Sequence, residues 1–457
     1  MSSCLLISAN QVVVPYPVYP LGVAHLLGVL RDDGHEARHF DLLSHGGLAA
    51  LEQLLTSTRF DLVGVSIRNL DTVDSNNPQG LLADILPCLE LIRRSTKAPL
   101  VLGGPGFSIM PAVLLDLFAA DYGVVGEGEK ILSWLAAELA QGRPPAQRLF
   151  HGGQDAFQWP RPRYEQEACD YYTRHGGMLN IQTKRGCPMK CTYCSYPTIE
   201  GTRLRSRDPD EVADDVDRLT RKHGARYIFF TDSVFNDHGG HFRLVAEALI
   251  KKGNTTPWCA YFRPQNIKAA DLRLLKRAGL QALEMGTDAA TDTTLAALNK
   301  GFTFAEAVEA NGLAVAAGLS CAHFIMFGGP DESPATLAEG LANLEQLAGS
   351  VIFAFTGIRI LPGTALRERA IMDGLITEQE NLVEPVFYYS PQVRRQEIDE
   401  ALRAAFARRQ EWVYPCEEAE ARVRMLHSMG HDGPLWDLLL GRGLRRGKGP
   451  LDASMPL

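Results

Sequence analysis

The sequence predicts an α/β protein made of two successive parallel-sheet units and a mostly helical C-terminal region. Short apolar runs alternate with stretches of helical periodicity through residues 1–145, and the alternation returns in residues 176–370. Because parallel strands need long crossover connections, usually helices, this rhythm is typical of parallel sheets. The 457 residues exceed what one hydrophobic core normally organises, so separate domains are expected.

Residues 1–145 predict an open, doubly wound sheet. Helical spacing of apolar residues predicts helices over 21–31 and 81–94. Ligands of such sheets bind outside the carboxyl ends of the strands. Residues 146–175 include a proline-rich run and are predicted as a linker. The five predicted strands begin at Cys4, Ala37, Leu62, Leu100 and Tyr122.

Residues 176–370 predict a second unit of six β/α repeats. A count of six favours a partial (β/α)6 barrel, whose chemistry belongs at the carboxyl ends of its strands. Residues 371–457 are predicted to be mostly helical and to cap the barrel mouth. Cys259 and Cys321 lie within apolar strands and are expected to be buried packing rather than ligands. The predicted strands cover residues 179–183, 225–232, 258–262, 282–286, 322–327 and 352–359.

Three cysteines on one loop carry the strongest chemical signal of the chain. Cys187, Cys191 and Cys194 have the spacing C-x3-C-x2-C. Three thiolates this close are suited to hold three irons of a cubane [4Fe–4S] cluster, which leaves the fourth iron open to another ligand. The motif therefore predicts an iron–sulfur site with one exchangeable position.

The same cysteines have other interpretations. A zinc site would lack its fourth ligand and would have an unusual spacing. Inert buried thiols disagree with the neighbouring Lys184, Arg185 and Lys190, which are poor core residues. A disulfide is not expected, because the cysteine total of nine is odd and no signal peptide is recognisable.

The cysteine loop resembles the signature of the radical SAM superfamily. The resemblance implies that the open iron chelates S-adenosylmethionine (SAM), whose reductive cleavage yields a 5′-deoxyadenosyl radical, and that Tyr193 covers the cluster. The stretch 284–288 resembles the family segment that contacts the SAM ribose and amino group. For Asp232 and Glu284, helix capping remains an alternative. The SAM-binding residues implied by the resemblance are Tyr193, Asp232, Glu284, Gly286 and Thr287.

The loops of the first unit resemble a Rossmann-like cobalamin-binding domain that precedes the barrel in a large class of radical SAM enzymes. The polar segment 66–71 follows the predicted third strand, and glycines follow the fourth and fifth, at the edge where ligands bind. Simple tight turns are the alternative explanation for these glycines. The cobalamin-binding residues implied by the resemblance are Ser66, Arg68, Asn69, Gly103, Gly104, Gly126 and Glu127.

The chain departs from one cobalamin motif. Many cobalamin proteins carry D-x-H-x-x-G after the second strand, and their histidine coordinates cobalt. Leu43 occupies that position here, and His45 stands two residues later. We therefore expect no histidine ligand to cobalt. Arg68 is a candidate to lie under the corrin instead, or to brace its own loop by pairing with Asp71 or Asp74.

A basic trio follows the cysteine loop. Arg203, Arg205 and Arg207 stand at every second position and would project on one side if this segment were extended. They are suited to hold carboxylates or phosphates of cobalamin or a substrate. A structural role in salt bridges is equally open.

The resemblance implies a cobalamin-dependent radical SAM enzyme, most simply a C-methyltransferase acting on an unactivated carbon of a small molecule or lipid. A non-methylating cyclase or lipid-remodelling enzyme of the same build is the second hypothesis, and a redox or cobalamin sensor is a third. An electron donor such as flavodoxin or ferredoxin is expected. The net charge of −8 gives no drive towards nucleic acid. No apolar run is long enough to span a bilayer, and we expect a cytoplasmic protein.

Overall fold

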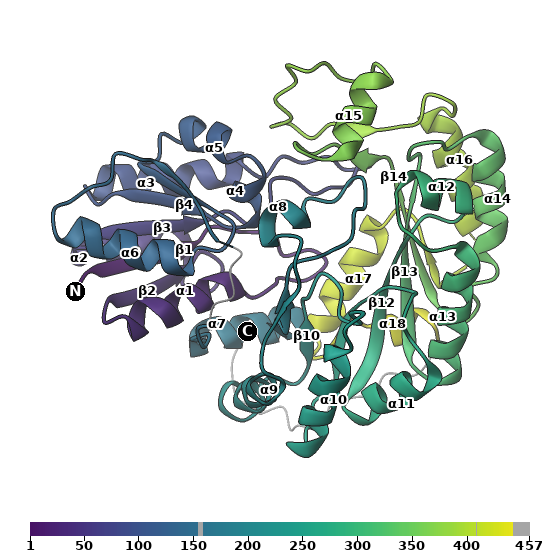
Figure 1. The fold of residues 1–457 in the computed structure, drawn as a ribbon, viewed down its shortest axis with the longest axis horizontal. Coiled ribbons are helices and arrows are strands. Elements are labelled where there is room, and N and C mark those ends of the chain that lie inside the picture. Colours follow the sequence, from purple (N-terminus) through teal and green to yellow (C-terminus); the bar gives the residue numbers. More distant parts are fainter. Residues whose placement is uncertain (154–158, 408, 442–457) are drawn as a thin grey trace.

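The structure is a computed structural model that describes residues 1–153, 159–407 and 409–441. Two α/β units lie side by side, the first built around a small sheet and the second around a barrel-like sheet (Figure 1). The fold class predicted from sequence is confirmed. Among the described residues, no helix is long and apolar enough to cross a membrane.

The first unit is a six-stranded parallel sheet with the order β2-β1-β3-β4-β5-β6. Apolar side chains of α1 and α6 cover one face, and those of α2 and α3 cover the other. Helices on both faces make the sheet doubly wound, as predicted. The elements are β1 (Ser3–Ser8), α1 (Leu21–Asp32), β2 (Glu36–Asp41), α2 (Gly47–Ser57), β3 (Leu62–Ser66), the 3-10 turn η1 (Ala83–Ile85), α3 (Leu86–Ser95), β4 (Leu100–Gly103), α4 (Pro105–Ile109), α5 (Pro111–Leu117), β5 (Tyr122–Val125) and α6 (Glu129–Ala140).

The stretch predicted as a linker contains regular structure at both ends. β6 (Leu149–His151) pairs in parallel with β5, and α7 (Gln166–Gly176) packs against the barrel. A three-residue strand is too short to give a periodicity signal. The proline-rich residues 159–165 form neither helix nor strand, as expected. Residues 154–158 lie outside the described part of the chain.

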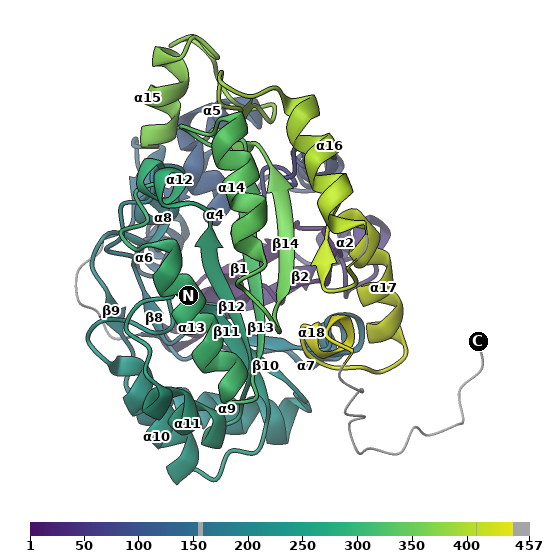
Figure 2. The same ribbon diagram turned by 90° about the vertical axis from the view of Figure 1, so that its right-hand side faces the viewer.

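The second unit is a parallel sheet with the order β17-β14-β13-β12-β11-β10-β7. It contains all six predicted strands, and the prediction missed a seventh, the two-residue β17. Helices including α13 and α14 cover its outer face (Figure 2). The elements are β7 (Leu179–Ile181), β8 (Lys184–Arg185), α8 (Tyr196–Glu200), β9 (Arg205–Ser206), α9 (Pro209–His223), β10 (Ile228–Phe230), α10 (His241–Lys251), β11 (Trp258–Phe262), α11 (Ala269–Arg277), β12 (Leu280–Asp288), α12 (Asp292–Ala297), α13 (Phe304–Ala316), β13 (Ser320–Phe327), α14 (Pro334–Leu344), β14 (Val351–Thr356) and β17 (Trp412–Val413).

Alternation along the barrel strands separates an outer face from an inner one. On β12, Leu283 and Met285 pack into the core under the outer helices, while Ala282 belongs to a separate inner cluster. Because side chains alternate along a strand, Glu284 shares the inner side with Ala282, and Gly286 follows it; a register shift between Met285 and Asp288 interrupts the alternation before Asp288. The inner face of β12 is therefore the one that can present groups to a bound molecule.

The C-terminal region, predicted to be mostly helical, holds its helices among long turns and loops, and its last helix does not cap the barrel mouth. The Ser320 hydroxyl, at the amino end of β13, donates to Asp437 of α18, and the Trp436 ring contacts Phe324 and Phe353. The prediction is corrected here: α18 plugs the amino-terminal end of the barrel. Residues 442–457 lie outside the described chain. The elements are β15 (Ile358–Arg359), α15 (Ala365–Met372), β16 (Phe387–Tyr388), α16 (Arg395–Phe406), α17 (Glu417–Ser428) and α18 (Trp436–Leu439).

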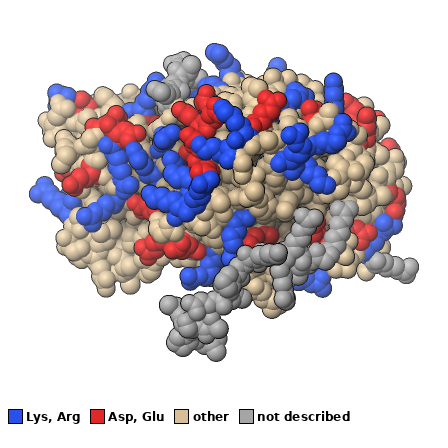
Figure 3. Space-filling view, turned by 90° about the horizontal axis from the view of Figure 1, so that it is seen from below, with Lys and Arg blue, Asp and Glu red and all other residues tan. Residues whose placement is uncertain are grey.

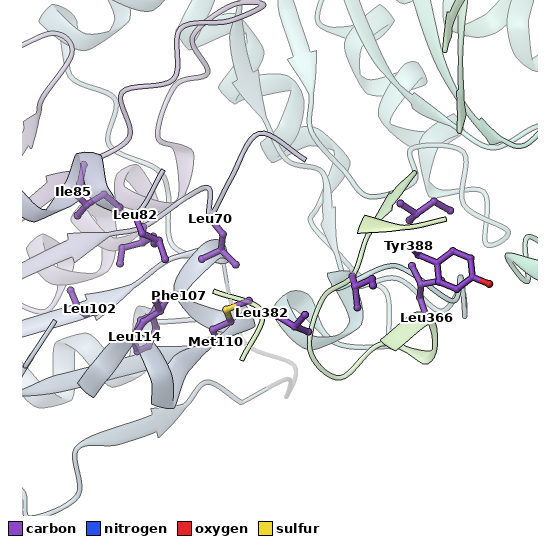
Figure 4. Close-up of a cluster of buried hydrophobic side chains, with 14 of the residues drawn as sticks. Leu70, Leu82, Ile85, Leu102, Phe107, Met110, Leu114, Leu366, Leu382 and Tyr388 are labelled. Atoms are coloured by element: carbon purple, nitrogen blue, oxygen red, sulfur yellow. The ribbon is translucent and has the colours of Figure 1, made fainter. Parts of the chain in front are cut away.

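The two units share buried contacts. One cluster of buried apolar side chains includes Leu70 and Met110 from the first unit and Leu366, Leu382 and Tyr388 from the second (Figure 4). Such a shared core fixes one unit against the other, because separating them would expose apolar surface.

The lower face of the molecule carries interspersed basic and acidic groups (Figure 3). On neighbouring helices, Lys251 and Lys252 of α10 pair with Asp210 and Asp214 of α9. Exposed pairs of this kind contribute little to stability. Lys251 and Lys252 are thus partnered within the fold.

Candidate functional site

The cysteine loop leaves the barrel directly after β7 and is closed by the two-stranded hairpin β8–β9. Gly186 has φ +91, and a Cβ there would lie 2.0 Å from the Arg203 carbonyl oxygen, so only glycine fits this close approach. The backbone N–H of Cys187 donates to the Gly201 carbonyl at 3.0 Å. The hairpin therefore ties together both ends of the segment that carries the cysteines.

The three cysteines are within electrostatic reach of one another. The pKa of the Cys194 thiol is raised to about 12, mainly by burial and in smaller part by Cys191 and Cys187, against a backbone hydrogen bond from Tyr196 that lowers it. No group of three metal-binding side chains among the described residues is gathered around a single point. A cubane binds each thiolate through a different iron, so its ligands stand farther apart than those of one ion. Three cysteines on one loop are therefore compatible with a cubane cluster.

Asp288 connects the end of β12 to the cysteine loop. The Tyr193 hydroxyl and the Lys300 ammonium both donate to its carboxylate. Asp288 has φ +66, and the Thr192 N–H donates to the Leu298 carbonyl at 3.1 Å nearby. Tyr193 is thus fixed beside the loop. Asp288 lies within the predicted SAM motif 284–288, but neither it nor Lys300 was a predicted site residue, because their proximity to the cysteines comes only from the fold.

Asp232 is hydrogen-bonded to the residues that lead into the cysteine loop. It is fully buried and accepts hydrogen bonds from the Thr183 N–H at 2.6 Å and from the Thr183 hydroxyl at 2.5 Å. Lys184 Nζ lies 3.5 Å from it. None of these contacts is helix capping, one of the two sequence-based interpretations, and the SAM contact of Asp232 stays a prediction. Asp232 anchors the backbone that leads into the cysteine loop.

Two predicted SAM residues on β12 face opposite directions. Glu284 lies on the inner side, 2 % exposed, and its Oε1 atom has no hydrogen-bond partner among the described residues. Burial raises its pKa to about 8, and a hydrogen bond from Tyr261 works in the other direction. Thr287 is hydrogen-bonded to His323 Nδ1 at 2.8 Å on the outer side. The structure therefore does not bring Thr287 together with Glu284 and Gly286.

A cavity of about 300 Å³ lies at the carboxyl ends of β1, β3, β4 and β5, where the doubly wound sheet predicts a ligand site. Residues 180, 182 and 185 of the barrel unit also line it, so the cavity lies between the units. Asn69 is not among its lining residues. Six residues predicted to bind cobalamin line the cavity together: Ser66, Arg68, Gly103, Gly104, Gly126 and Glu127.

Arg68 is available inside this cavity. It makes no ion pair with Asp71 or Asp74 among the described residues; Asp71 pairs instead with Arg359 at 2.7 Å. The loop-bracing alternative for Arg68 is therefore wrong. His45 lies in a turn, where its Nδ1 accepts from the Asp41 N–H at 3.1 Å.

A buried charge network joins the two units beside the cavity. Arg185 Nη2 lies 2.7 Å from Glu129, and its Nη1 lies 3.5 Å from Glu127. Arg205 pairs with Glu127, and Arg185 stacks on Trp159 at 4.2 Å from the ring centroid. Glu127 was predicted from sequence to bind cobalamin, and its ion pairs with Arg185 and Arg205 were not predicted.

The three arginines that follow the cysteine loop do not share one environment. Arg207 is buried and pairs with Asp215 at 2.6 Å, while Arg205 pairs with Glu127. Arg203 is exposed. Of the two open interpretations, the structure supports salt bridges for Arg205 and Arg207. Cys259 and Cys321 are fully buried in strands, as expected for packing residues.

The comparisons with known proteins agree with this geometry. The model of the radical SAM superfamily matches residues 181–341, and that of the B12 binding domain matches residues 7–136. The chain belongs to the cobalamin-dependent radical SAM family. Family membership makes it an enzyme and brings a [4Fe–4S] cluster, SAM and cobalamin as cofactors.

Similar proteins of this family include methyltransferases. The chain is 28 % identical to a tryptophan 2-C-methyltransferase from Streptomyces laurentii over 78 % of its own length and 72 % of the relative's. The structure of the radical SAM methyltransferase TsrM from Kitasatospora setae, with cobalamin and a [4Fe–4S] cluster bound, matches with a TM-score of 0.84 and 25 % identity over 97 % of this chain and 98 % of that one. An anaerobic magnesium-protoporphyrin IX monomethyl ester cyclase from Cereibacter sphaeroides is 26 % identical over 64 % of this chain and 50 % of its own.

The cavity's polar groups fit a cobalamin. The Nδ2 atom of Asn10 and the Nε2 atom of His25, both lining residues, are buried and have no hydrogen-bond partner in the part of the chain that the structure describes. Buried polar atoms are normally hydrogen-bonded, so unpartnered ones indicate a bound molecule. A corrin carries amide groups around its edge, which both donate and accept hydrogen bonds. Neither Asn10 nor His25 was selected from sequence, because single polar residues in apolar segments give no pattern.

Proposed function

We propose that this enzyme is a C-methyltransferase acting on an unactivated carbon of a small molecule or lipid. The observation that carries the proposal is the position of the cavity, which is lined by residues of both units and lies next to the cysteine loop. When bound, the cofactors supply one-electron chemistry and a transferable methyl group; the chain supplies placement and exclusion of water. A flavodoxin or ferredoxin is the proposed electron donor.

The residue roles in this proposal follow from burial and position. Cys187, Cys191 and Cys194 hold the cluster, and Asp288 with Tyr193 lies beside it. Gly286, without a side chain, leaves space for SAM on the inner face of β12. Arg68 faces the corrin as a cation and disfavours a lower cobalt ligand. The remaining cavity residues, Ser66, Gly103, Gly104 and Gly126, let the backbone approach the cofactor.

The inner face of the barrel is the proposed substrate chamber. Tyr261 is 37 % exposed, although burial raises the pKa of its hydroxyl well above the usual value. Because the Tyr261 side chain is partly accessible to solvent and yet surrounded by protein, it lines a space inside the barrel. Its neighbours are Phe229, at 5.2 Å between ring centroids, and the buried Glu284. An apolar, aromatic space with one acid favours an apolar substrate that carries a hydrogen-bond donor, and tryptophan, which the Streptomyces laurentii relative acts on, is the first candidate.

The test is an anaerobic reaction with the reconstituted enzyme, SAM, a chemical reductant and tryptophan. Methyl transfer predicts S-adenosylhomocysteine and a substrate heavier by one methylene, and radical initiation predicts 5′-deoxyadenosine. Cys191→Ala is expected to lose the cluster absorbance near roughly 400 nm and all products derived from it. Cluster without retained cobalamin would contradict the methyl-transfer proposal.

A cyclase is the second candidate, favoured by the similarity to the magnesium-protoporphyrin cyclase. It predicts 5′-deoxyadenosine without S-adenosylhomocysteine in the same reaction. The two product ratios therefore separate the candidates. A sensor without turnover would give neither product.

A further inference from the structure

The hairpin that closes the cysteine loop places two like charges directly opposite each other. Arg185 of β8 and Arg205 of β9 are partners in the antiparallel register. Like charges at directly opposite strand positions repel each other and destabilise the pair. The hairpin therefore needs anions close by, and the barrel unit does not supply them alone.

The first unit supplies these anions from the loop between β5 and α6. Glu127 and Glu129 contact the two guanidinium groups, and the four side chains are only 4–11 % exposed. Two positive and two negative charges make the group neutral overall, which lowers the cost of burying it. Glu129 is also the first residue of α6, where an acidic side chain interacts favourably with the helix dipole.

Three of these four residues reach the cavity, and one of the three also stands next to the cysteine loop. Glu127, Glu129 and Arg185 line the cavity, and Arg185 stands two residues before Cys187. Both Glu127 oxygens are buried and accept no hydrogen bond of good geometry among the described residues, although the arginines are in ion-pair contact. Glu127 thus has acceptor capacity left for a molecule in the cavity.

We propose that Glu127, Glu129, Arg185 and Arg205 form a charge bridge that positions the cysteine loop relative to the cobalamin site, so that occupancy of one site strengthens the other. They are positioning residues and take no part in bond making. A displacement of the loop at Glu127 and Glu129 moves the guanidinium groups, and these move the hairpin that holds the cysteines. The inference rests on the family's cofactors and not on the proposed substrate.

The test is a binding cycle. Cobalamin affinity is measured by equilibrium dialysis of hydroxocobalamin against cluster-loaded protein and against the cluster-free Cys191→Ala variant. The same pair of measurements is made in a Glu127→Gln/Glu129→Gln background. Glu138→Gln is the matched control. Glu138 lies on α6, as Glu129 does, and pairs with Arg143 at 2.6 Å, but it does not line the cavity.

In the native background we expect the cluster to tighten cobalamin binding about five-fold or more, the lower range of typical coupling between sites. In the Glu127→Gln/Glu129→Gln background, cobalamin affinity should be the same with and without the cluster. In Glu138→Gln, the cluster should tighten cobalamin binding as it does in the native protein. Electron paramagnetic resonance of the reduced protein adds a distance-sensitive readout: spin coupling between cluster and cob(II)alamin should change only in the bridge variant.

Equal loss of cobalamin affinity with and without the cluster would reduce these residues to simple cofactor contacts and overturn the proposal. Native protein that binds cobalamin equally in both states would also overturn it. If the double variant does not fold by circular dichroism, Glu127→Gln alone keeps the Arg185–Glu129 pair and takes its place. Lack of methylation would contradict the proposed function and leave the bridge untouched.

Discussion

At the scale of single residues, the site is organised by polar groups that the fold leaves without partners. Arg68 in the cavity makes no ion pair among the described residues, and the buried Oε1 of Glu284 inside the barrel has no hydrogen-bond partner among them. A buried, unpartnered polar atom costs free energy unless a ligand satisfies it. These two residues are therefore where substitutions report on chemistry rather than on packing.

Glu284 gives the protein a pH-dependent stability. Burial raises its pKa to about 8, so the folded protein holds a proton that the unfolded chain releases above about pH 4.5. The contribution of Glu284 to the free energy of unfolding is fully present below that pH. It declines by a few kcal/mol in total as the pH rises to about 8. Glu284→Gln should therefore be more stable than the native protein at about pH 8.5, with the difference shrinking towards about pH 5.

Thermal unfolding midpoints across this pH range measure the effect. Glu138→Gln, at a surface ion pair, is the control and should show no comparable trend between about pH 5 and about pH 8.5. A stability difference for Glu284→Gln that stays constant with pH would mean that this carboxyl group does not hold a proton in the folded state.

Arg68 is predicted to keep the lower face of cobalt free of nitrogen ligands. Electron paramagnetic resonance of cob(II)alamin bound to the native protein should show no nitrogen splitting. Arg68→His offers an imidazole, a common metal ligand, at the same place and should introduce that splitting. His45→Ala should leave the native spectrum unchanged, since Nδ1 of His45 is engaged in its own turn. Nitrogen splitting in the native protein that disappears in His45→Ala would refute this account.

At the scale of elements, the hairpin β8–β9 decides whether the cysteine loop has one shape. Gly186 combines a positive φ with a 2.0 Å approach to the Arg203 carbonyl oxygen. We expect Gly186→Ala to separate β8 from β9, because a backbone atom cannot yield as a flexible side chain does. Iron and sulfide content after anaerobic reconstitution should fall to near zero.

Gly224 offers the matched control. It has φ +70, but a Cβ there meets nothing within 4 Å. Gly224→Ala should cost about 1 kcal/mol of stability from backbone strain alone and keep the cluster. Equal cluster content in both variants would show that closing the hairpin is not required for cluster binding.

At the scale of the whole molecule, the two units are held by a buried ion pair as well as by shared apolar packing. Asp71 and Arg359 are 1 % and 3 % exposed, and Arg359 also donates to the Leu382 carbonyl at 2.8 Å. Removing one partner of such a pair leaves an uncompensated buried charge. The pair therefore specifies how the units meet.

Arg359→Ala should lower the free energy of unfolding by about 3–5 kcal/mol, because Asp71 remains buried as a lone anion. The double variant Asp71→Asn/Arg359→Met should recover much of the loss, since no net charge stays buried. Differential scanning calorimetry compares the three proteins. A double variant as unstable as Arg359→Ala would place the effect in packing and not in charge.

The sequence by itself determined the element types and the cofactor chemistry. Alternating apolar runs predicted five of the six strands of the first sheet and six of the seven strands of the barrel, and the spacing of Cys187, Cys191 and Cys194 indicated the cluster. These are local patterns: strand periodicity and ligand spacing are properties of neighbouring residues. Gly103, Gly104 and Gly126 were found for the same reason, at the ends of predicted strands.

Only the tertiary structure decided which side chains meet. Asp232 accepts a hydrogen bond from the backbone that leads into the cysteine loop, and Thr287 points to the outer face of the barrel. Tyr193 donates a hydrogen bond to Asp288. Glu127 of the first unit pairs with Arg205 of the second. The short strands β6 and β17 likewise exist because a longer neighbour pairs with them. Contacts between residues far apart in the chain depend on packing and on burial of charge, which leave no periodic mark in the sequence.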